Sequence, residues 1–188
     1  MTQLELLKFS LPYSNRTCTG RRGGQAELCM TVTLLPCRLE GIDVYSNILY
    51  SRGEEGKADL SMLAQRAIAV DRYTPETCVV VGNYFSMMSR HEKAVQYFQR
   101  ALVLNPEYLS AYTLMGHEFI ETKNTSAALQ AYRRALAIDD SDYRAWYGLG
   151  QTYELLHQNF HSLFYFRQAA RLRPRDARMF VAVGASCR

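Results

Sequence analysis

Apolar side chains recur at helical spacing through the second half of the chain, and short polar breaks separate one segment from the next. Ala94, Phe98 and Ala101 stand at i, i+4 and i+7, which places them on one face of a helix. We expect this helix over 92–104 and an earlier one over 75–88. The pattern therefore predicts pairs of antiparallel helices.

Residues that begin and end helices stand where this pattern requires them. Thr74, Asp142 and Asp176 each precede an apolar segment and are good N-caps. Pro106 and Pro174 follow second helices, which they stop because proline lacks the backbone donor.

The pattern repeats every 34 residues. Aromatic residues keep this step at two positions, and small residues keep it at two more: Gly82, Gly116, Gly150 and Gly184, and Ala101, Ala135 and Ala169. A glycine inside a helix costs about 0.5–1 kcal/mol relative to alanine, so its recurrence at one phase indicates a close helix contact. We interpret these residues as repeat-packing residues that do no chemistry.

A 34-residue period with these residue types resembles the tetratricopeptide repeat, a helix–turn–helix unit that stacks into a solenoid. The resemblance implies an all-α fold, a right-handed superhelical solenoid of stacked antiparallel helix pairs. Regular repeats are expected at 75–108, 109–142 and 143–176, with a degenerate repeat at 41–74 and a truncated one at 177–188.

Residues 1–40 show no helical period, and we expect them to form a poorly ordered leader of uncertain origin. Their single Arg-Gly-Gly-like patch at 21–24 is weak evidence for RNA contact, and a solvated loop is the preferred interpretation. Whether 1–35 are genuine protein sequence stays open, and we expect them to be dispensable for folding. Because the last repeat stops inside its first helix, we expect the chain to be a fragment of a longer protein.

Composition narrows the class of protein further. The 188 residues are 48% hydrophobic and carry a net charge of +4, which neither demands nor excludes an acidic partner. No apolar run reaches the length of a membrane helix, and the first residues do not resemble a signal peptide. Five cysteines, an odd number without a CxxC pair, indicate a reducing intracellular location with neither disulfides nor a zinc site.

Several segments are more specific than a generic repeat: YSNILY at 45–50, HEKA with YFQRAL within 91–102, TLMGHE at 113–118, KNTSAA at 123–128 and YRAWYGLGQTYE at 143–154. Together they closely resemble the cell division cycle protein 23 family, the eighth subunit of the anaphase-promoting complex (cyclosome). The likeness covers about 36–184. It is absent from 1–35, the later repeats of the family are missing after Arg188, and Tyr112 stands where the family leads us to expect tryptophan.

This resemblance implies a non-catalytic scaffold subunit of a ubiquitin ligase, present in the nucleus and cytoplasm. Such a subunit binds neighbouring subunits and a coactivator through its repeats, and so promotes cyclin ubiquitination and mitotic progression. Full-length family members homodimerise through N-terminal repeats. The parts that this chain lacks leave open its oligomeric state and its function without later repeats.

We expect the partner surface on the first helix of each repeat, which faces the concave side of such a solenoid. The side chains predicted to line this groove are Val79, Asn83, Met87, Thr113, His117, Arg144, Tyr147 and Gln151. Their mixture of amide, aromatic and charged groups suits an extended peptide, although some of them could instead contact a neighbouring helix. The sequence does not identify the peptide.

A generic adaptor for the peptide tails of chaperones or other partners is the alternative. A clamp for a terminal carboxylate needs basic and amide donors along the groove. Asn83 and Arg144 are compatible with it, but Val79, Leu114 and Gly148 offer no donor. A third hypothesis is that the repeats regulate an enzyme attached in a longer protein.

Other chemistry is poorly supported by the sequence. His157 and His161 are four residues apart but straddle a predicted turn, so we expect no metal there. No phosphate loop, nucleophile elbow or carboxylate pair appears, which predicts no enzyme, no cofactor and no small-molecule ligand. From Tyr143 onward seven arginines stand against two acidic residues, a balance of +5 that favours a solvated or protein-contact face over nucleic acid.

Overall fold

The computed structural model describes residues 41–186, and helices are the only regular elements in this range. The prediction of an all-α solenoid is confirmed. The leader at 1–40 lies outside the described residues. The elements in chain order are α2 (Ile42–Ser51), the 3₁₀ helix η2 (Gly53–Gly56), α3 (Lys57–Val70), α4 (Pro75–Met87), α5 (His91–Leu104), α6 (Leu109–Glu121), α7 (Thr125–Ile138), α8 (Tyr143–Leu155), α9 (Asn159–Leu172) and α10 (Ala177–Ser186).

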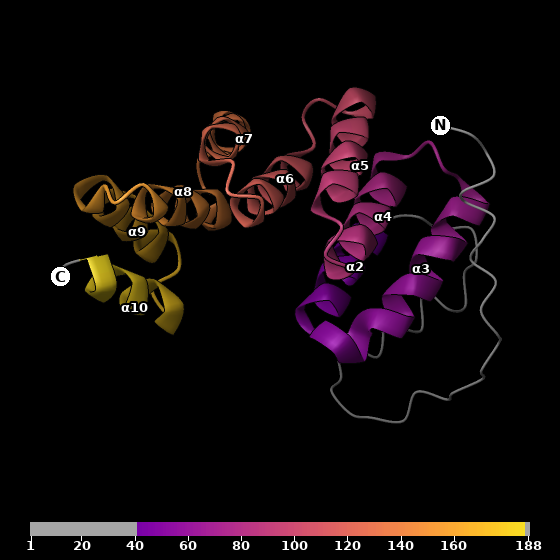
Figure 1. Ribbon diagram of the computed structural model, residues 1–188, viewed down its shortest axis with the longest axis horizontal. Coiled ribbons are helices and arrows are strands. Elements are labelled where there is room, and N and C mark those ends of the chain that lie inside the picture. The colour runs from indigo at the N-terminus through magenta and orange to yellow at the C-terminus, as the bar shows by residue number, and fades with distance from the viewer. Residues whose placement is uncertain (1–40, 187–188) are drawn as a thin grey trace.

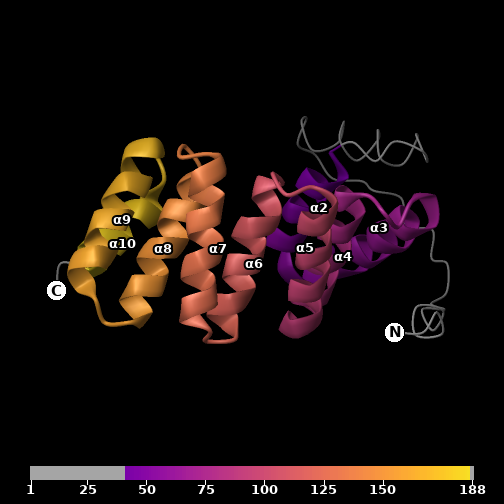
Figure 2. The ribbon, with the colours of Figure 1, turned by 90° about the horizontal axis from the view of Figure 1, so that it is seen from above.

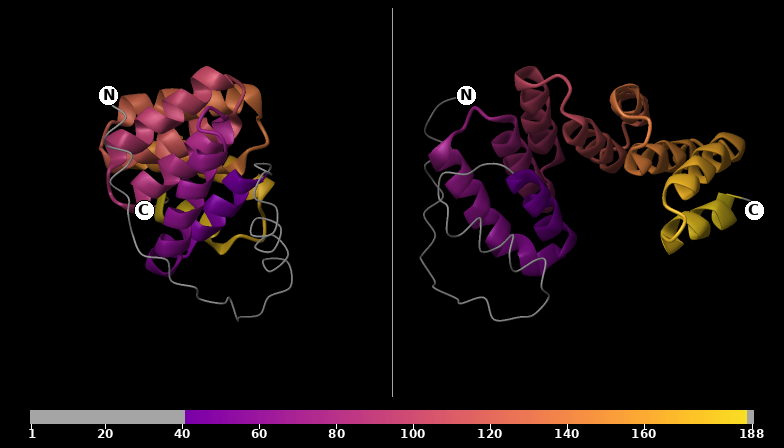
Figure 3. Two further views of the ribbon diagram at one scale, coloured as in Figure 1. Left: turned by 90° about the vertical axis from the view of Figure 1, so that its right-hand side faces the viewer. Right: turned by 180° about the vertical axis from the view of Figure 1, so that it is seen from behind.

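Successive helices pack as antiparallel pairs, and the pairs follow one another along the long axis of the molecule (Figure 2). The most extensive contacts join α4 to α5, α6 to α7 and α8 to α9, which are the two helices of each regular repeat. The array arches, with α5 and α7 along one edge and α2, α3 and α10 towards the other (Figure 1). The same arch is visible from behind in Figure 3.

The turn inside each regular repeat has one backbone design. Ser89, Lys123 and His157, which are 34 residues apart, adopt left-handed φ angles of 55°, 59° and 57°. In the first turn the Arg90 amide donates to the Phe85 carbonyl at 2.9 Å, and the Ser89 amide donates to Ser86 at 2.8 Å. This pair of bonds is a Schellman motif, which satisfies the last carbonyl groups of the first helix.

Each repeat packs a large aromatic ring of its second helix against a glycine of its first. Phe98, Tyr132 and Phe166 are fully buried, and each lies sixteen residues after Gly82, Gly116 or Gly150. A Cβ atom on Gly116 would stand 2.6 Å from the Tyr132 ring, and one on Gly150 would stand 2.5 Å from the Phe166 ring. These positions therefore have no room for a side chain larger than that of glycine. The alanines of the same step, Ala101, Ala135 and Ala169, are also fully buried.

Two glycines differ from the expectation drawn from the period. Gly184 has nothing within 4 Å of its Cβ direction, unlike the three earlier glycines of the series. Gly148, outside the 34-residue glycine series, closely approaches the other side of the Tyr132 ring. Tyr132 is thus held between glycines of α6 and α8, which ties the second repeat to the third.

Candidate subunit-binding surface

The first helices α4, α6, α8 and α10 present equivalent side chains in very different environments. Val79, Thr113, Tyr147 and Val181 occupy one repeat position at successive steps of 34. Val79 and Thr113 are 0% and 1% exposed, Tyr147 is partly exposed, and Val181 is 72% exposed. This position is therefore covered on α4 and α6 and becomes accessible on α8 and α10.

Val79 and Asn83 are buried because α2 packs across α4. The Asn83 amide nitrogen donates to Ser46 Oγ at 2.8 Å and to Asn47 Oδ1 at 2.7 Å, both on α2. The degenerate repeat covers the surface that the sequence analysis assigned to a ligand. In this structure both side chains contribute to packing and hydrogen bonding between helices, which corrects the expectation that they are accessible.

Thr113 and Met87 are also less available than expected. Thr113 is buried on α6, and its hydroxyl donates to the carbonyl oxygen of Ser110 at 3.0 Å. The side chain thus satisfies its own helix and presents no donor to a ligand. Met87, near the end of α4, is partly buried and packs against the core of the first repeats.

His117 is partly exposed on α6, but its Nδ1 is engaged with the hydroxyl of Tyr132 at 2.8 Å. Burial and the nearby charge of Arg144 lower the pKa of His117 to about 4. The imidazole is therefore neutral at physiological pH. It contributes to holding the Tyr132 ring between the two glycines and brings no positive charge to the surface.

Arg144, Tyr147 and Gln151 form the accessible part of the predicted groove on α8. Tyr147 packs on Phe166 with ring centroids 5.3 Å apart, which fixes its ring beside the arginine of the preceding turn. Arg144 Nε donates to Asp142 Oδ1 at 3.0 Å, and the same carboxylate oxygen caps α8 by accepting from the Arg144 amide. The arginine is thereby positioned with part of its side chain still open to solvent.

The next repeat copies this arrangement. Arg178 Nη2 donates to Asp176 Oδ2 at 2.6 Å, and these hydrogen bonds hold the pKa of the Asp176 carboxyl below its usual range. Arg144 and Arg178 are 34 residues apart on successive first helices. The surface thus places two guanidinium groups near Tyr147, each already paired with an aspartate two residues before it.

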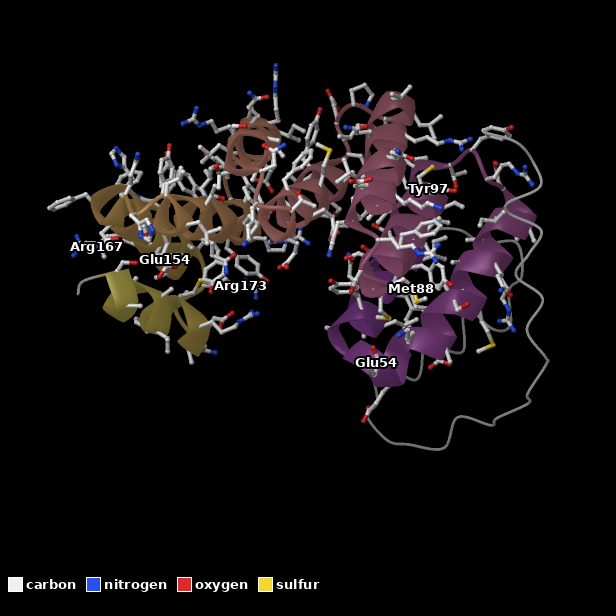
Figure 4. The ribbon with its side chains drawn as sticks, viewed as in Figure 1. Glu54, Met88, Tyr97, Glu154, Arg167 and Arg173 are labelled. Atoms are coloured by element: carbon white, nitrogen blue, oxygen red, sulfur yellow. The ribbon has the colours of Figure 1, made fainter. Side chains whose placement is uncertain are left out.

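A surface cavity of about 480 Å³ lies at the turn between α9 and α10, where the sequence analysis predicted no site. Its lining is Arg173, Pro174, Arg175, Asp176 and Ala177. The Arg173 guanidinium lies 4.6 Å from the centre of the Tyr143 ring (Figure 4 labels Arg173). Four arginines lie within four residues of Pro174, and this local density was the signal in the sequence for a basic cavity.

A buried polar cluster near the end of α6 was also missed. Glu118 is buried, accepts from Ser86 Oγ at 2.6 Å and lies 2.8 Å from His91 Nδ1. His91, the first residue of α5, is partly buried by this contact with α6. The cluster joins α4, α5 and α6 and has its polar atoms satisfied internally.

The paired histidines are separated by the turn, as the sequence analysis expected. His157 is the left-handed residue of the Schellman turn, and the His161 ring stacks on Tyr153 at 5.3 Å. Among residues 41–186 no group of three potential metal-ligating side chains is found. Within the same range no helix is both long and apolar enough to span a bilayer.

Comparison with known protein families agrees with this geometry. A tetratricopeptide repeat model matches 143–176, and a second model described as a TPR repeat matches 116–156. Residues 116–176 therefore match tetratricopeptide repeats. The match over 143–176 has the same bounds as the third regular repeat expected from the 34-residue step, which contains α8 and α9.

About half of this chain is similar to proteins named anaphase-promoting complex subunit 8. The protein of that name from Dictyostelium discoideum is 59% identical over 93 residues, which is 50% of this chain and 15% of the relative. The protein of the same name from Arabidopsis thaliana is 55% identical over 89 residues, or 47% of this chain and 15% of the relative. The matched region thus spans about 15% of the length of either relative.

A solved structure supports the fold across a larger part of the chain. The crystal structure of the APC/C hetero-tetramer Cut9-Hcn1 superposes with a TM-score of 0.79 and covers 87% of this chain and 31% of the matched one. Sequence identity in that match is 18%, so it shows the tetratricopeptide architecture alone.

Proposed function

We propose that this chain acts as part of a non-catalytic scaffold subunit of the anaphase-promoting complex ubiquitin ligase. The observation that carries the proposal is the 59% identity over 93 residues to a protein named anaphase-promoting complex subunit 8. In this role the repeats bind neighbouring subunits and a coactivator segment. They thereby promote cyclin ubiquitination and mitotic progression, in the nucleus and cytoplasm.

The geometry supports binding rather than catalysis. The titratable groups near the accessible surface serve the fold, since His117 contacts Tyr132 and Asp142 caps α8. The accessible part offers Arg144, Tyr147 and Gln151 on one rigid helix. A positioned aromatic ring beside an arginine is typical of a protein-binding surface, where these two residue types contribute most of the binding energy.

Homodimerisation is proposed for a full-length protein of this family and not for this segment alone. The degenerate repeat in this chain is already engaged with α4 through Asn83, Ser46 and Asn47. A dimer contact through the first repeats would therefore use surface of α2 or α3 that faces away from α4.

The two residues that were compatible with a chaperone adaptor are both engaged within the fold, which weakens this alternative. Asn83, one of the two compatible donors, is buried and uses its amide nitrogen on α2. Arg144, the other, is already paired with Asp142 at 3.0 Å. A carboxylate clamp would have to break one interaction or both, which would cost about 1–3 kcal/mol for each buried group left unpaired.

The test is capture of the tagged full chain from dividing cells of its own source, with quantitative mass spectrometry. We expect anaphase-promoting complex subunits in the captured material and a clear loss of at least one of them with Tyr147→Ala and Gln151→Ala combined. Gln130→Ala, on the opposite helix of the preceding repeat, is the matched control and should change nothing. Capture of heat-shock chaperones without ligase subunits would overturn the proposal and favour the adaptor.

A further inference from the structure

The outward face of α9 carries an unusual row of side chains. Phe160, Phe164, Arg167 and Arg171 stand at i, i+4, i+7 and i+11, and all four are exposed. Phe160 is 90% exposed and Phe164 is 52% exposed. We call these four residues the α9 stripe. Arg167, labelled in Figure 4, lies at the end of the molecule distant from the first repeats.

The other repeats show that the fold does not require aromatic residues at these positions. Equivalent positions in the earlier second helices are also exposed, and they hold polar or small residues in most cases: Glu92, Gln96, Gln99 and Val103 in α5, and Ser126, Gln130, Arg133 and Ala137 in α7. Because residues at the same repeat positions of α5 and α7 are exposed and are not aromatic, the packing of a repeat does not require Phe160 and Phe164. Two exposed phenylalanines one helical turn apart need a different explanation.

The charge of the same surface is unbalanced. No acidic residue occurs between Leu155 and Arg175, and neither Arg167 nor Arg171 makes an ion pair within the described part of the chain. Arg171 Nη1 donates to Gln168 Oε1 at 3.3 Å, and this bond leaves its charge uncompensated. The basic half of the α9 stripe is therefore available to carboxylates.

We propose that the α9 stripe is a docking site for an acidic amphipathic helix of another protein. Apolar side chains of that helix pack on Phe160 and Phe164, and its carboxylates bind the guanidinium groups of Arg167 and Arg171. The stripe is about 17 Å long at 1.5 Å per residue, which matches about three helical turns of a partner. It lies on a second helix, so it is a different surface from the one on α8.

Two features favour this occupant over the others. Aromatic and basic groups are segregated at opposite ends of the stripe, whereas single-stranded nucleic acid is bound by aromatic side chains interleaved along a basic track. A second copy of this chain is disfavoured by charge, because the chain has a net charge of +4 and the stripe is itself basic.

In the experiment, a display library of helical peptides with randomised sequences is screened for peptides that bind the full chain. Enriched peptides are then measured by fluorescence anisotropy against the chain and its variants. Phe160→Ser with Phe164→Gln installs the residues that α7 carries at the equivalent positions, and Arg167→Gln installs the residue of α5. These changes preserve the fold because the same side chains are already exposed at the same repeat positions. Circular dichroism checks this.

The expected peptides combine Leu or Phe near one end with Asp or Glu near the other. Their affinity should fall roughly tenfold or more with the double phenylalanine variant. It should fall a few-fold with Arg167→Gln, by a factor that shrinks as salt is raised. The control variant Gln130→Ala should bind as the unmodified chain does.

Three outcomes would overturn the proposal. Enriched peptides that bind the double phenylalanine variant as tightly as the unmodified chain would place the contact elsewhere. Binding of a single-stranded oligonucleotide that the variant abolishes, without any acidic peptide, would assign the stripe to nucleic acid. Sedimentation that shows a dimer dissolved by the same variant would assign it to a second copy of the chain.

Discussion

At the scale of single residues, the Tyr132 ring is notable because it packs closely against two glycines, Gly116 and Gly148. The period of 34 identified Gly116 but not Gly148, because the second glycine does not recur at that step. A ring that contacts glycines of both α6 and α8 couples two repeats. Changes there should affect the stability of the stack as well as that of one helix.

Gly116→Ala and Gly184→Ala form a matched pair of substitutions. A Cβ on Gly116 stands 2.6 Å from the fully buried Tyr132 ring, so we expect a loss of about 1–3 kcal/mol. Gly184 has open space, so alanine there should be neutral or stabilise by up to about 1 kcal/mol through helix propensity. Urea unfolding of both variants measures the difference. Equal effects would show that the glycine–aromatic contact does not determine stability.

His117 predicts a dependence of stability on pH. Its pKa is about 4 in the fold against about 6.5 when exposed, so the unfolded chain binds the proton first as pH falls. The contribution of the neutral imidazole to the free energy of unfolding is fully present above about pH 6.5. It is lost as the pH falls from there to 4, by up to about 3 kcal/mol.

The measurement is urea unfolding at several pH values for the unmodified chain and for His117→Gln. Other groups also titrate in this window, so the informative quantity is the difference between the two curves. We expect the unmodified chain to lose more stability on acidification than the variant does. Parallel curves would contradict the burial of a neutral imidazole.

At the scale of elements, the helices followed closely from the sequence. α4 and α5 occupy 75–87 and 91–104, within a residue of the expected ranges, because caps, prolines and apolar spacing agree there. The position of α2 did not follow. The degenerate repeat has Ile48 where later repeats have glycine, so the period does not show how closely α2 approaches α4. That approach buries Val79 and Asn83, which the sequence placed in the groove.

The α2–α4 contact can be tested at Asn83 with a built-in control. Asn83→Ala removes two hydrogen bonds and leaves partners on α2 unsatisfied, which should cost about 1–3 kcal/mol. Gln151 occupies the same repeat position two steps later, is partly exposed and makes no side-chain hydrogen bond within the described residues. Gln151→Ala should therefore change stability by less than about 0.5 kcal/mol. Chemical denaturation that ranked the two variants equally would contradict the contact.

At the scale of the whole molecule, each helix pair depends on its neighbours for burial. Repeat arrays of this kind gain stability from nearest-neighbour interfaces, so position along the array determines local stability. α4 packs against α2, α3 and α5, whereas α10 packs mainly on α9 and leaves Phe180 and Val181 exposed. The uneven accessibility of the predicted groove has the same origin, because the earlier inner helices are covered and the later ones are not.

Native-state hydrogen exchange should show this gradient directly. We expect the slowest amide exchange in α4 and α5, where the largest buried cluster is centred, and the fastest among the helices in α10. Met179→Ala offers a perturbation at that end, because this fully buried side chain of α10 is enclosed by the last helix pair. It should accelerate exchange in α10 and α9 while leaving α4 and α5 unchanged, since coupling passes only between adjacent repeats. Mass spectrometry of peptide fragments measures the exchange in each helix. Equal acceleration in every helix would instead show that the array unfolds as one cooperative unit.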